Sequence, residues 1–152
     1  MLVAASLPIG LDLPYSTPVS ERGLPPLATV IFFIDCINRG DVAALGQLMA
    51  DDHALQVFDE APLIGRQDNV EAWHGYAANF PSYAIHPHRV AEVGGRVAVV
   101  GHTTGSHLGL PDEEERVLTL IWVADVEHGL VRSWRLMEDS PQNRGRLGLD
   151  LG

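Results

Sequence analysis

The spacing of hydrophobic residues changes once along this chain, at Pro81. Before Pro81 apolar residues recur with the period of a helix, and after it they alternate with polar residues over four long runs. Alternation of this kind is typical of strands with one buried face. The link Gly94-Gly95 joins the first two runs, and glycine supplies the positive φ that tight hairpins require. This order predicts an α+β domain, with helices first and an antiparallel meander after them.

Capping and turn residues divide the two halves into elements. Pro25 and Pro26 precede a helix that is apolar on nearly every face. Gly40 can end that helix, and Asp41 and Asp68 can cap the two that follow. The predicted helices are 27–38, 42–50 and 69–79, and the predicted strands are 53–58, 83–93, 96–107, 115–126 and 130–138.

Length and composition allow one folded domain with two flanking segments. The chain has 152 residues, of which 46% are hydrophobic and 20% charged, as in ordinary globular proteins. Five prolines within residues 1–26 predict an extended or irregular arm, whose leucines suggest that it docks on something apolar. We therefore divide the chain into an N-terminal arm (1–26), one domain (27–148) and a C-terminal tail (149–152). The terminal stretch from Ser140 onward is expected to be partly ordered.

Charge and residue usage exclude several functions. The net charge is −10 and all ten basic residues are arginines, so no basic face is expected for nucleic acid or anionic membrane. Without lysine, Schiff-base chemistry through that residue is excluded. The apolar N-terminal stretch is short and interrupted by prolines, unlike a signal peptide or a membrane span. Cys36 is the single cysteine, which fits a reducing cytoplasm.

Four strings of residues resemble a known superfamily. They are FFIDCINRGDVAALGQLMADDHALQVF, IGRQDNVEAWHGYAANFPSY, GHTTGSHLGL and GLVRSWRLMED. Their order and spacing are similar to the nuclear transport factor 2-like superfamily and its SnoaL-like branch, which include ketosteroid isomerases, limonene epoxide hydrolases and polyketide cyclases. The resemblance covers 27–148. It implies a cone-shaped fold in which three N-terminal helices pack on a curved antiparallel sheet, a small-molecule pocket between them, and a homodimer through the outer face of the sheet.

The resemblance also indicates where catalytic groups would fall. The tyrosine of ketosteroid isomerases falls at Phe33 and their aspartate base at or near Val57, and neither residue can do that chemistry. Asp59 lies two residues after Val57 and becomes a displaced base if the strand continues.

Two further catalytic candidates follow from the SnoaL-like strings. The Trp-Asp pair of the last strand reads Trp134-Arg135 here, and the next acidic residue is Glu138. His107 keeps the Gly-x-His feature. The resulting hypothesis has Asp59 or His107 as the base and Glu138 as its partner, with burial moving their pKa values toward neutrality.

Other residues are candidates for the pocket wall. Strict alternation places His102 and His107 on opposite faces of one strand, so at most one of them reaches the pocket. Phe33, Trp73, Trp122 and Trp134 offer flat apolar surface, and the indoles add a hydrogen-bond donor. The alternative for the tryptophans is packing in the core or at a dimer interface.

The remaining chemistry-bearing residues point to no metal or covalent centre. His86-Pro87-His88 puts two imidazoles on one strand face, but no third ligand follows from the spacing. Cys36 lies on an apolar helix, where a buried thiol is inert. The acidic run Asp112–Glu115 is interpreted as a solvated loop.

These observations favour a small-molecule enzyme that performs acid/base chemistry without a cofactor, of the isomerase, cyclase or hydrolase type, on a hydrophobic substrate. The alternative is a non-catalytic module of the same fold that binds a hydrophobic ligand or serves dimerisation. The apolar character of the predicted pocket fits both hypotheses, and only the ionisable residues distinguish them.

Overall fold

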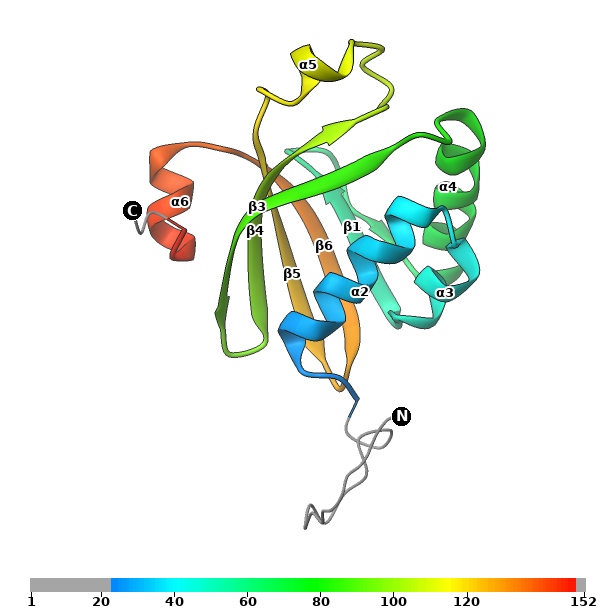
Figure 1. Ribbon diagram of the computed structural model, residues 1–152. Coiled ribbons are helices and arrows are strands. Elements are labelled where there is room, and N and C mark those ends of the chain that lie inside the picture. The colour runs from blue at the N-terminus through cyan, green and yellow to red at the C-terminus, as the bar shows by residue number, and fades with distance from the viewer. Residues whose placement is uncertain (1–22, 150–152) are drawn as a thin grey trace, which may run out of the picture.

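The computed structural model describes residues 23–149, so the predictions for residues 1–22 and 150–152 lie outside the described residues. Figure 1 shows helices arranged around one curved sheet. The helices are α2 (Pro26–Arg39), α3 (Val42–Gln47), α4 (Arg66–Asn79), α5 (Asp112–Glu115) and α6 (Pro141–Leu147). The strands are β1 (Met49–Val57), β2 (Leu63–Ile64), β3 (Ala84–Val93), β4 (Arg96–Thr104), β5 (Leu120–Glu127) and β6 (Leu130–Glu138).

The sheet confirms the predicted meander and adds an unforeseen pairing. Its order is β2-β1-β6-β5-β4-β3, so β3 to β6 are neighbours in chain order. Every pair is antiparallel except β1 and β6, which run parallel. The expectation of a wholly antiparallel sheet is therefore wrong at this pair. Most of the domain separates β1 from β6, so no hairpin dictates their relative direction.

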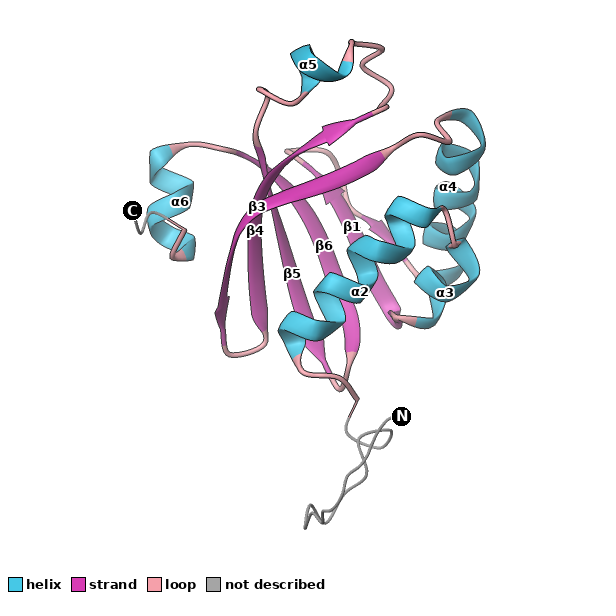
Figure 2. Cartoon of the chain, viewed as in Figure 1, coloured by secondary structure: helices cyan, strands magenta, loops and turns pink. Residues whose placement is uncertain are grey.

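Helices α2, α3 and α4 lie on the concave side of the sheet, as predicted, and α6 lies on the other side (Figure 2). Residues Val30, Phe33 and Ile37 of α2 pack into the main core, which includes Trp122 and Trp134 of the sheet. These helix residues are three or four apart, so they share one face. Alternation along β5 directs Trp122 and Ala124 inward while Ile121 and Val123 face outward.

The segment after Ser140 is ordered more than the sequence indicated. The Ser140 hydroxyl accepts a hydrogen bond from the backbone N–H of Asn143, Pro141 occupies the first turn, and Gly148 ends α6 in the left-handed conformation. Leu149 is fully buried in a second apolar cluster, beneath α6 on the outer face of the sheet.

Several element boundaries differ from prediction. Helix α3 ends at Gln47, and β1 begins at Met49 rather than His53. Asp51 and Asp52 do not end a regular element, because they occupy exposed positions of β1 and form ion pairs with arginines. Helix α4 begins at Arg66. The run predicted as a strand from residue 115 starts only at Leu120, after α5.

The prediction that Asp68 caps α4 is wrong. The N-cap residue is Gly65, and Asp68 lies in the first turn of the helix. Across residues 23–149, no helix has both the length and the apolar character needed to span a bilayer.

Candidate functional site

A cavity of about 210 Å³ lies between α4 and the concave face of the sheet. Three neighbouring strands, β1, β6 and β5, together with helix α4 and two loop residues form its wall. The lining residues are Leu55, Val57, Ala72, Trp73, Tyr76, Tyr83, His107, Trp122, Trp134 and Leu136.

Strand pairing explains why the apolar part of the wall is continuous. Leu55 lies opposite Trp134 and Val57 opposite Leu136 in the parallel β1–β6 pair. Trp122 lies opposite Leu136 in the next pair. Since side chains alternate along a strand, these residues all face the helices. All three tryptophans of the chain thus border the cavity, two of them only 2% exposed.

The polar part of the wall is a hydrogen-bonded pair, Tyr76 and His107. The Tyr76 Oη lies 2.9 Å from Nδ1 of His107 and also accepts a hydrogen bond from the His107 backbone N–H at 3.2 Å. The two rings meet edge to face, with centroids 5.8 Å apart. Contacts at both the ring and the backbone fix His107, which is exposed, at the edge of the cavity.

Two further residues of the cavity wall, Tyr83 and Trp73, carry hydrogen-bond donors. Burial raises the pKa of Tyr83 strongly, and burial raises the pKa of Tyr76 as well. Both phenols therefore keep their protons at neutral pH and can donate. Nε1 of Trp73 is buried and lacks a hydrogen-bond partner among the described residues.

The structure separates the predicted catalytic residues. His107 lines the cavity, whereas Asp59 and Glu138 are exposed and do not. The premise for Asp59, a strand that continues past Val57, is wrong, because β1 ends there and Phe58 turns the chain with φ 53°. Glu138 is the last residue of β6, two residues beyond Leu136 and past the end of the cavity wall.

The predicted wall residues divide in the same way. Trp73, Trp122 and Trp134 line the cavity. Phe33 does not, because it lies behind Trp134 in the core, fully buried, with ring centroids 4.9 Å apart. His102 lies on the opposite face, where its ring stacks on His86 at 4.6 Å and its Nδ1 lies 2.7 Å from Nε2 of His88. Of the two histidines only His107 lines the cavity, as expected, but the two do not alternate on one strand, because β4 ends at Thr104 rather than at residue 107 and Gly105 turns the chain with φ 68°.

Sequence reasoning missed one buried acid. Glu115, interpreted as part of a solvated loop, is 1% exposed, and the Thr103 hydroxyl donates a hydrogen bond to its Oε2. Its Oε1 is buried without a partner in the described part of the chain. The Glu115 charge adds to the burial that raises the pKa values of Tyr76 and Tyr83. Nothing in the run DEEE marks this residue as the buried one.

Tyr76 was also missed, although a signal existed. Trp73 and Tyr76 are three residues apart on a predicted helix, so they share a face.

Within residues 23–149, no three histidine, cysteine or acidic side chains converge as metal ligands. The ring of His86 stacks on that of His102, with centroids 4.6 Å apart.

A curved sheet with helices over its concave face and a small aromatic cavity between them defines a cone-shaped, small-molecule-binding class of protein. The family model for the SnoaL-like domain matches residues 30–134. The chain therefore belongs to the SnoaL-like domain family, which confirms the resemblance. Comparison with curated protein sequences gives no match.

Solved structures share the fold. An uncharacterized cystatin-fold protein from Novosphingobium aromaticivorans has a TM-score of 0.65 and 20% identity, covering 75% of this chain and 98% of its own. A putative polyketide cyclase from Sinorhizobium meliloti has a TM-score of 0.61 and 20% identity, covering 74% and 94%. An LEH-like epoxide hydrolase from M. tuberculosis has a TM-score of 0.60 and 16% identity, covering 75% and 82%.

Proposed function

We propose that this protein is a cofactor-independent enzyme that moves a proton on a small hydrophobic substrate, with His107 as the base and Tyr76 as the hydrogen-bond donor. The observation that carries the proposal is the Tyr76–His107 pair at the edge of a mainly apolar cavity. Membership of a family whose structural neighbours include a putative polyketide cyclase and an epoxide hydrolase supports it.

The cavity limits the substrate. A dry apolar cavity of roughly 150 Å³ admits benzene, so the 210 Å³ here suits one ring with a few substituents. The tryptophan faces favour a flat ring. Trp73 Nε1 and the tyrosine hydroxyls suit a substrate oxygen, because they can donate hydrogen bonds to it.

The pair can divide acid and base roles between its members. We assign the proton of the ring contact to His107, whose Nδ1–H then donates to Tyr76 Oη and leaves Nε2 with a free lone pair. Nε2 takes a proton from a carbon next to a substrate carbonyl. Tyr76 directs its own O–H to the carbonyl oxygen, where negative charge develops. The proton then returns from Nε2 to another substrate atom, which completes an isomerisation or precedes a ring closure.

A binding module is the second candidate, and one observation favours it. Of the described residues that line the cavity, none carries a carboxylate. The cavity would then hold a hydrophobic ligand without reacting with it, and the Tyr76–His107 pair would only fix the loop that bears His107.

An exchange experiment distinguishes these candidates without the natural substrate. One-ring and two-ring ketones are incubated with the protein in D₂O, and loss of the α-proton signal is followed by NMR. We expect exchange above the buffer rate, reduced roughly 10²-fold or more in His107→Gln and less in Tyr76→Phe. His74→Gln, an exposed histidine of α4, is the matched control and should exchange normally.

Binding of the same ketones is measured by tryptophan fluorescence, since all three tryptophans border the cavity. Binding without exchange, and unaltered by His107→Gln, would establish the binding module and overturn the enzyme. The variants Asp59→Asn and Glu138→Gln test the assignment from sequence, and loss of exchange in either would return that residue to the mechanism.

A further inference from the structure

A second apolar hollow lies away from the candidate site, between α2 and the edge strand β3. It has a volume of about 320 Å³. We call it the α2–β3 groove and define it by Leu27, Val30, Ile31 and Ile34 of α2 and Pro87 and Val90 of β3. The polar residues that border it, Asp35 and Asn38, lie on the last turns of α2. The part nearest the start of α2 is therefore wholly apolar.

The groove exposes side chains that a folded protein normally covers. Ile31 is 57% exposed, Val90 38% and Leu27 36%. Contiguous apolar surface of this kind marks a site for another segment or molecule, whereas single exposed residues need no explanation.

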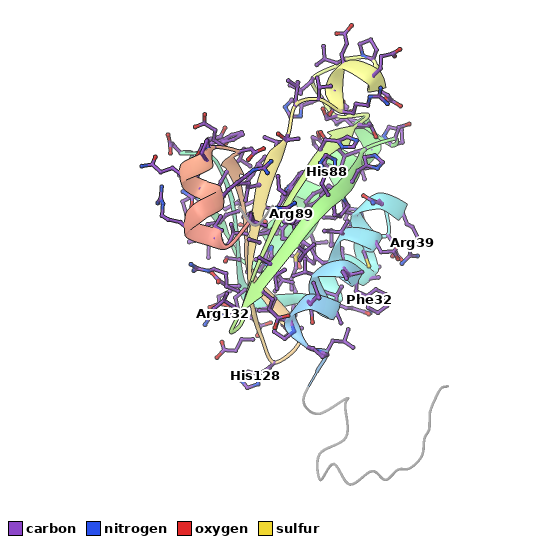
Figure 3. All side chains as sticks on the ribbon, turned by 60° about the vertical axis from the view of Figure 1, so that its left-hand side comes forward. Phe32, Arg39, His88, Arg89, His128 and Arg132 are labelled. Atoms are coloured by element: carbon purple, nitrogen blue, oxygen red, sulfur yellow. The ribbon has the colours of Figure 1, made fainter. Side chains whose placement is uncertain are left out.

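The point at which the preceding chain reaches the groove is fixed. Gly23 packs so closely on the β5–β6 turn that an added Cβ would lie 2.5 Å from the backbone oxygen of His128. The Thr29 hydroxyl then donates to the carbonyl oxygens of Leu24 and Pro25 and holds the start of α2. Figure 3 shows His128 beside the first described residues, at the foot of α2. Leu27, the first groove residue, is the second residue of α2 and lies in its first turn.

The sequence before Gly23 contains a segment that matches the groove. Leu7, Ile9, Leu11 and Leu13 alternate with other residues, so an extended segment 7–13 would present all four on one face. Such a segment is about 20 Å long. The groove follows α2 from Leu27 to Asn38, which is about 16 Å. The ten residues 14–23 reach at most about 33 Å, enough to return the segment along the helix.

We propose that residues 7–13 of this chain dock in the α2–β3 groove, with their four alternating apolar side chains against Leu27, Ile31 and Val90. A second copy of the chain is the competing occupant. Tethering favours the chain's own segment, because a short linker gives it an effective concentration in the millimolar range. This inference is independent of the proposed function, since the groove shares no lining residue with the cavity.

Methyl NMR on the full-length chain tests the proposal. In the variant Ile9→Asp/Leu11→Asp we expect the δ1-methyl signals of Ile31 and Ile34 to shift relative to the unaltered chain. The signals of Ile64, which is 61% exposed on β2, and of Ile121, which is buried, should stay in place. The control Ser16→Asp/Thr17→Asp adds the same charge outside the docking segment and should move none of them. Unmoved signals of Ile31 and Ile34 in the first variant would overturn the proposal.

Disulfide trapping identifies the occupant. Cysteines introduced singly at positions 7, 9, 11 or 13 are combined with Ile31→Cys or with Phe32→Cys. Phe32 is 49% exposed on the same helix but does not line the groove, so it is the matched control (Figure 3). We expect a disulfide within one chain to form roughly tenfold faster with position 31. Equal rates for positions 31 and 32, or a disulfide that joins two chains, would contradict docking of the chain's own segment.

Discussion

His53 is a fully buried histidine in the core behind the cavity. Its Nδ1 donates to the backbone oxygen of Val131 at 2.6 Å, and its ring lies 5.9 Å from that of Phe33. The other nitrogen, Nε2, is buried without a partner in the described part of the chain. Burial lowers the pKa of His53 below its ordinary value, so the folded protein holds this imidazole neutral.

This histidine predicts a loss of stability in mild acid. Because the pKa is lower in the folded state, the unfolded chain binds the proton first as pH falls below the ordinary histidine pKa of about 6.5. The stability contributed by the neutral form is present above that pH and is lost below it, with a slope that approaches about 1.4 kcal/mol per pH unit. Urea unfolding between pH 7.5 and 5 measures it.

The matched variants are His53→Gln and His74→Gln. Removing the buried imidazole should lower stability at neutral pH and flatten the decline in acid, because the titrating group is gone. His74 is exposed, so its variant should keep the wild-type pH dependence. An equally steep decline in His53→Gln would show that other groups, such as His102, whose pKa is also lowered by burial and by His86 and His88, account for the effect.

Residue-level predictions succeeded where alternation alone decides direction. On β5, Trp122, a candidate for the pocket wall, faces inward together with Ala124. On β4, His102 faces outward, but His107 lies beyond this strand, which ends at Thr104, so alternation does not decide its direction. Alternation failed for Asp59, because β1 ends at Val57 and the positive φ of Phe58 turns the chain before Asp59 is reached. Burial of Glu115 could not be predicted either, because it depends on how a four-residue helix folds back onto Thr103.

At the scale of elements, α6 is held to the sheet by a carboxylate at the end of β6. Asp139 forms two hydrogen bonds with Arg144, at 2.6 and 2.8 Å, and the Thr119 hydroxyl donates a third at 2.5 Å. The bonds from Arg144 lower the pKa of Asp139 to about 2. Its side chain is only 9% exposed, so solvent screens this pair less than it screens the other ion pairs.

Asp139→Asn should therefore destabilise the protein by about 2 kcal/mol at pH 7. The folded pKa is depressed, so this contribution exists above about pH 4 and disappears as pH falls toward 2. The difference in unfolding free energy from wild type should shrink over the same range. Asp35→Asn, which removes the exposed pair with Arg39, is the control and should cost less than about 0.5 kcal/mol. Equal effects of the two substitutions would show that Asp139 does not anchor α6.

Local signals predicted the elements well and their partners less well. The Gly94-Gly95 hairpin and the helix break at Gly40 follow from backbone conformations that only a few residues adopt, and both are observed. The direction of β1 beside β6 has no local cause in the sequence. Helix α6 has its own sequence signals, Ser140 and Pro141 at the start and Gly148 at the end, and these would have predicted it.

At the scale of the whole molecule, we propose a homodimer that forms through the outer face of the sheet. Helix α6 already covers the apolar half of that face, over Val100, Ile121 and Val123. The contact would then use the half that carries His86, His88 and His102. Sedimentation equilibrium at micromolar concentration should give twice the 16.5 kDa of one chain. His102→Glu should weaken the dimer and His74→Glu should not, whereas a monomer at that concentration would contradict the proposal.

Because β1 pairs with β6, the cavity wall can form during synthesis only after β6 has been made. Its wall joins Leu55 and Val57, near the start of the domain, to Trp134 and Leu136, near its end. A ribosome has made most of the domain before the second pair emerges, so the nascent chain carries β1 without its neighbour. Pairings between distant parts of a chain form slowly. The ligand site should thus be the last part of the fold to form, and a ligand added during refolding should stabilise the final state without speeding the earlier steps.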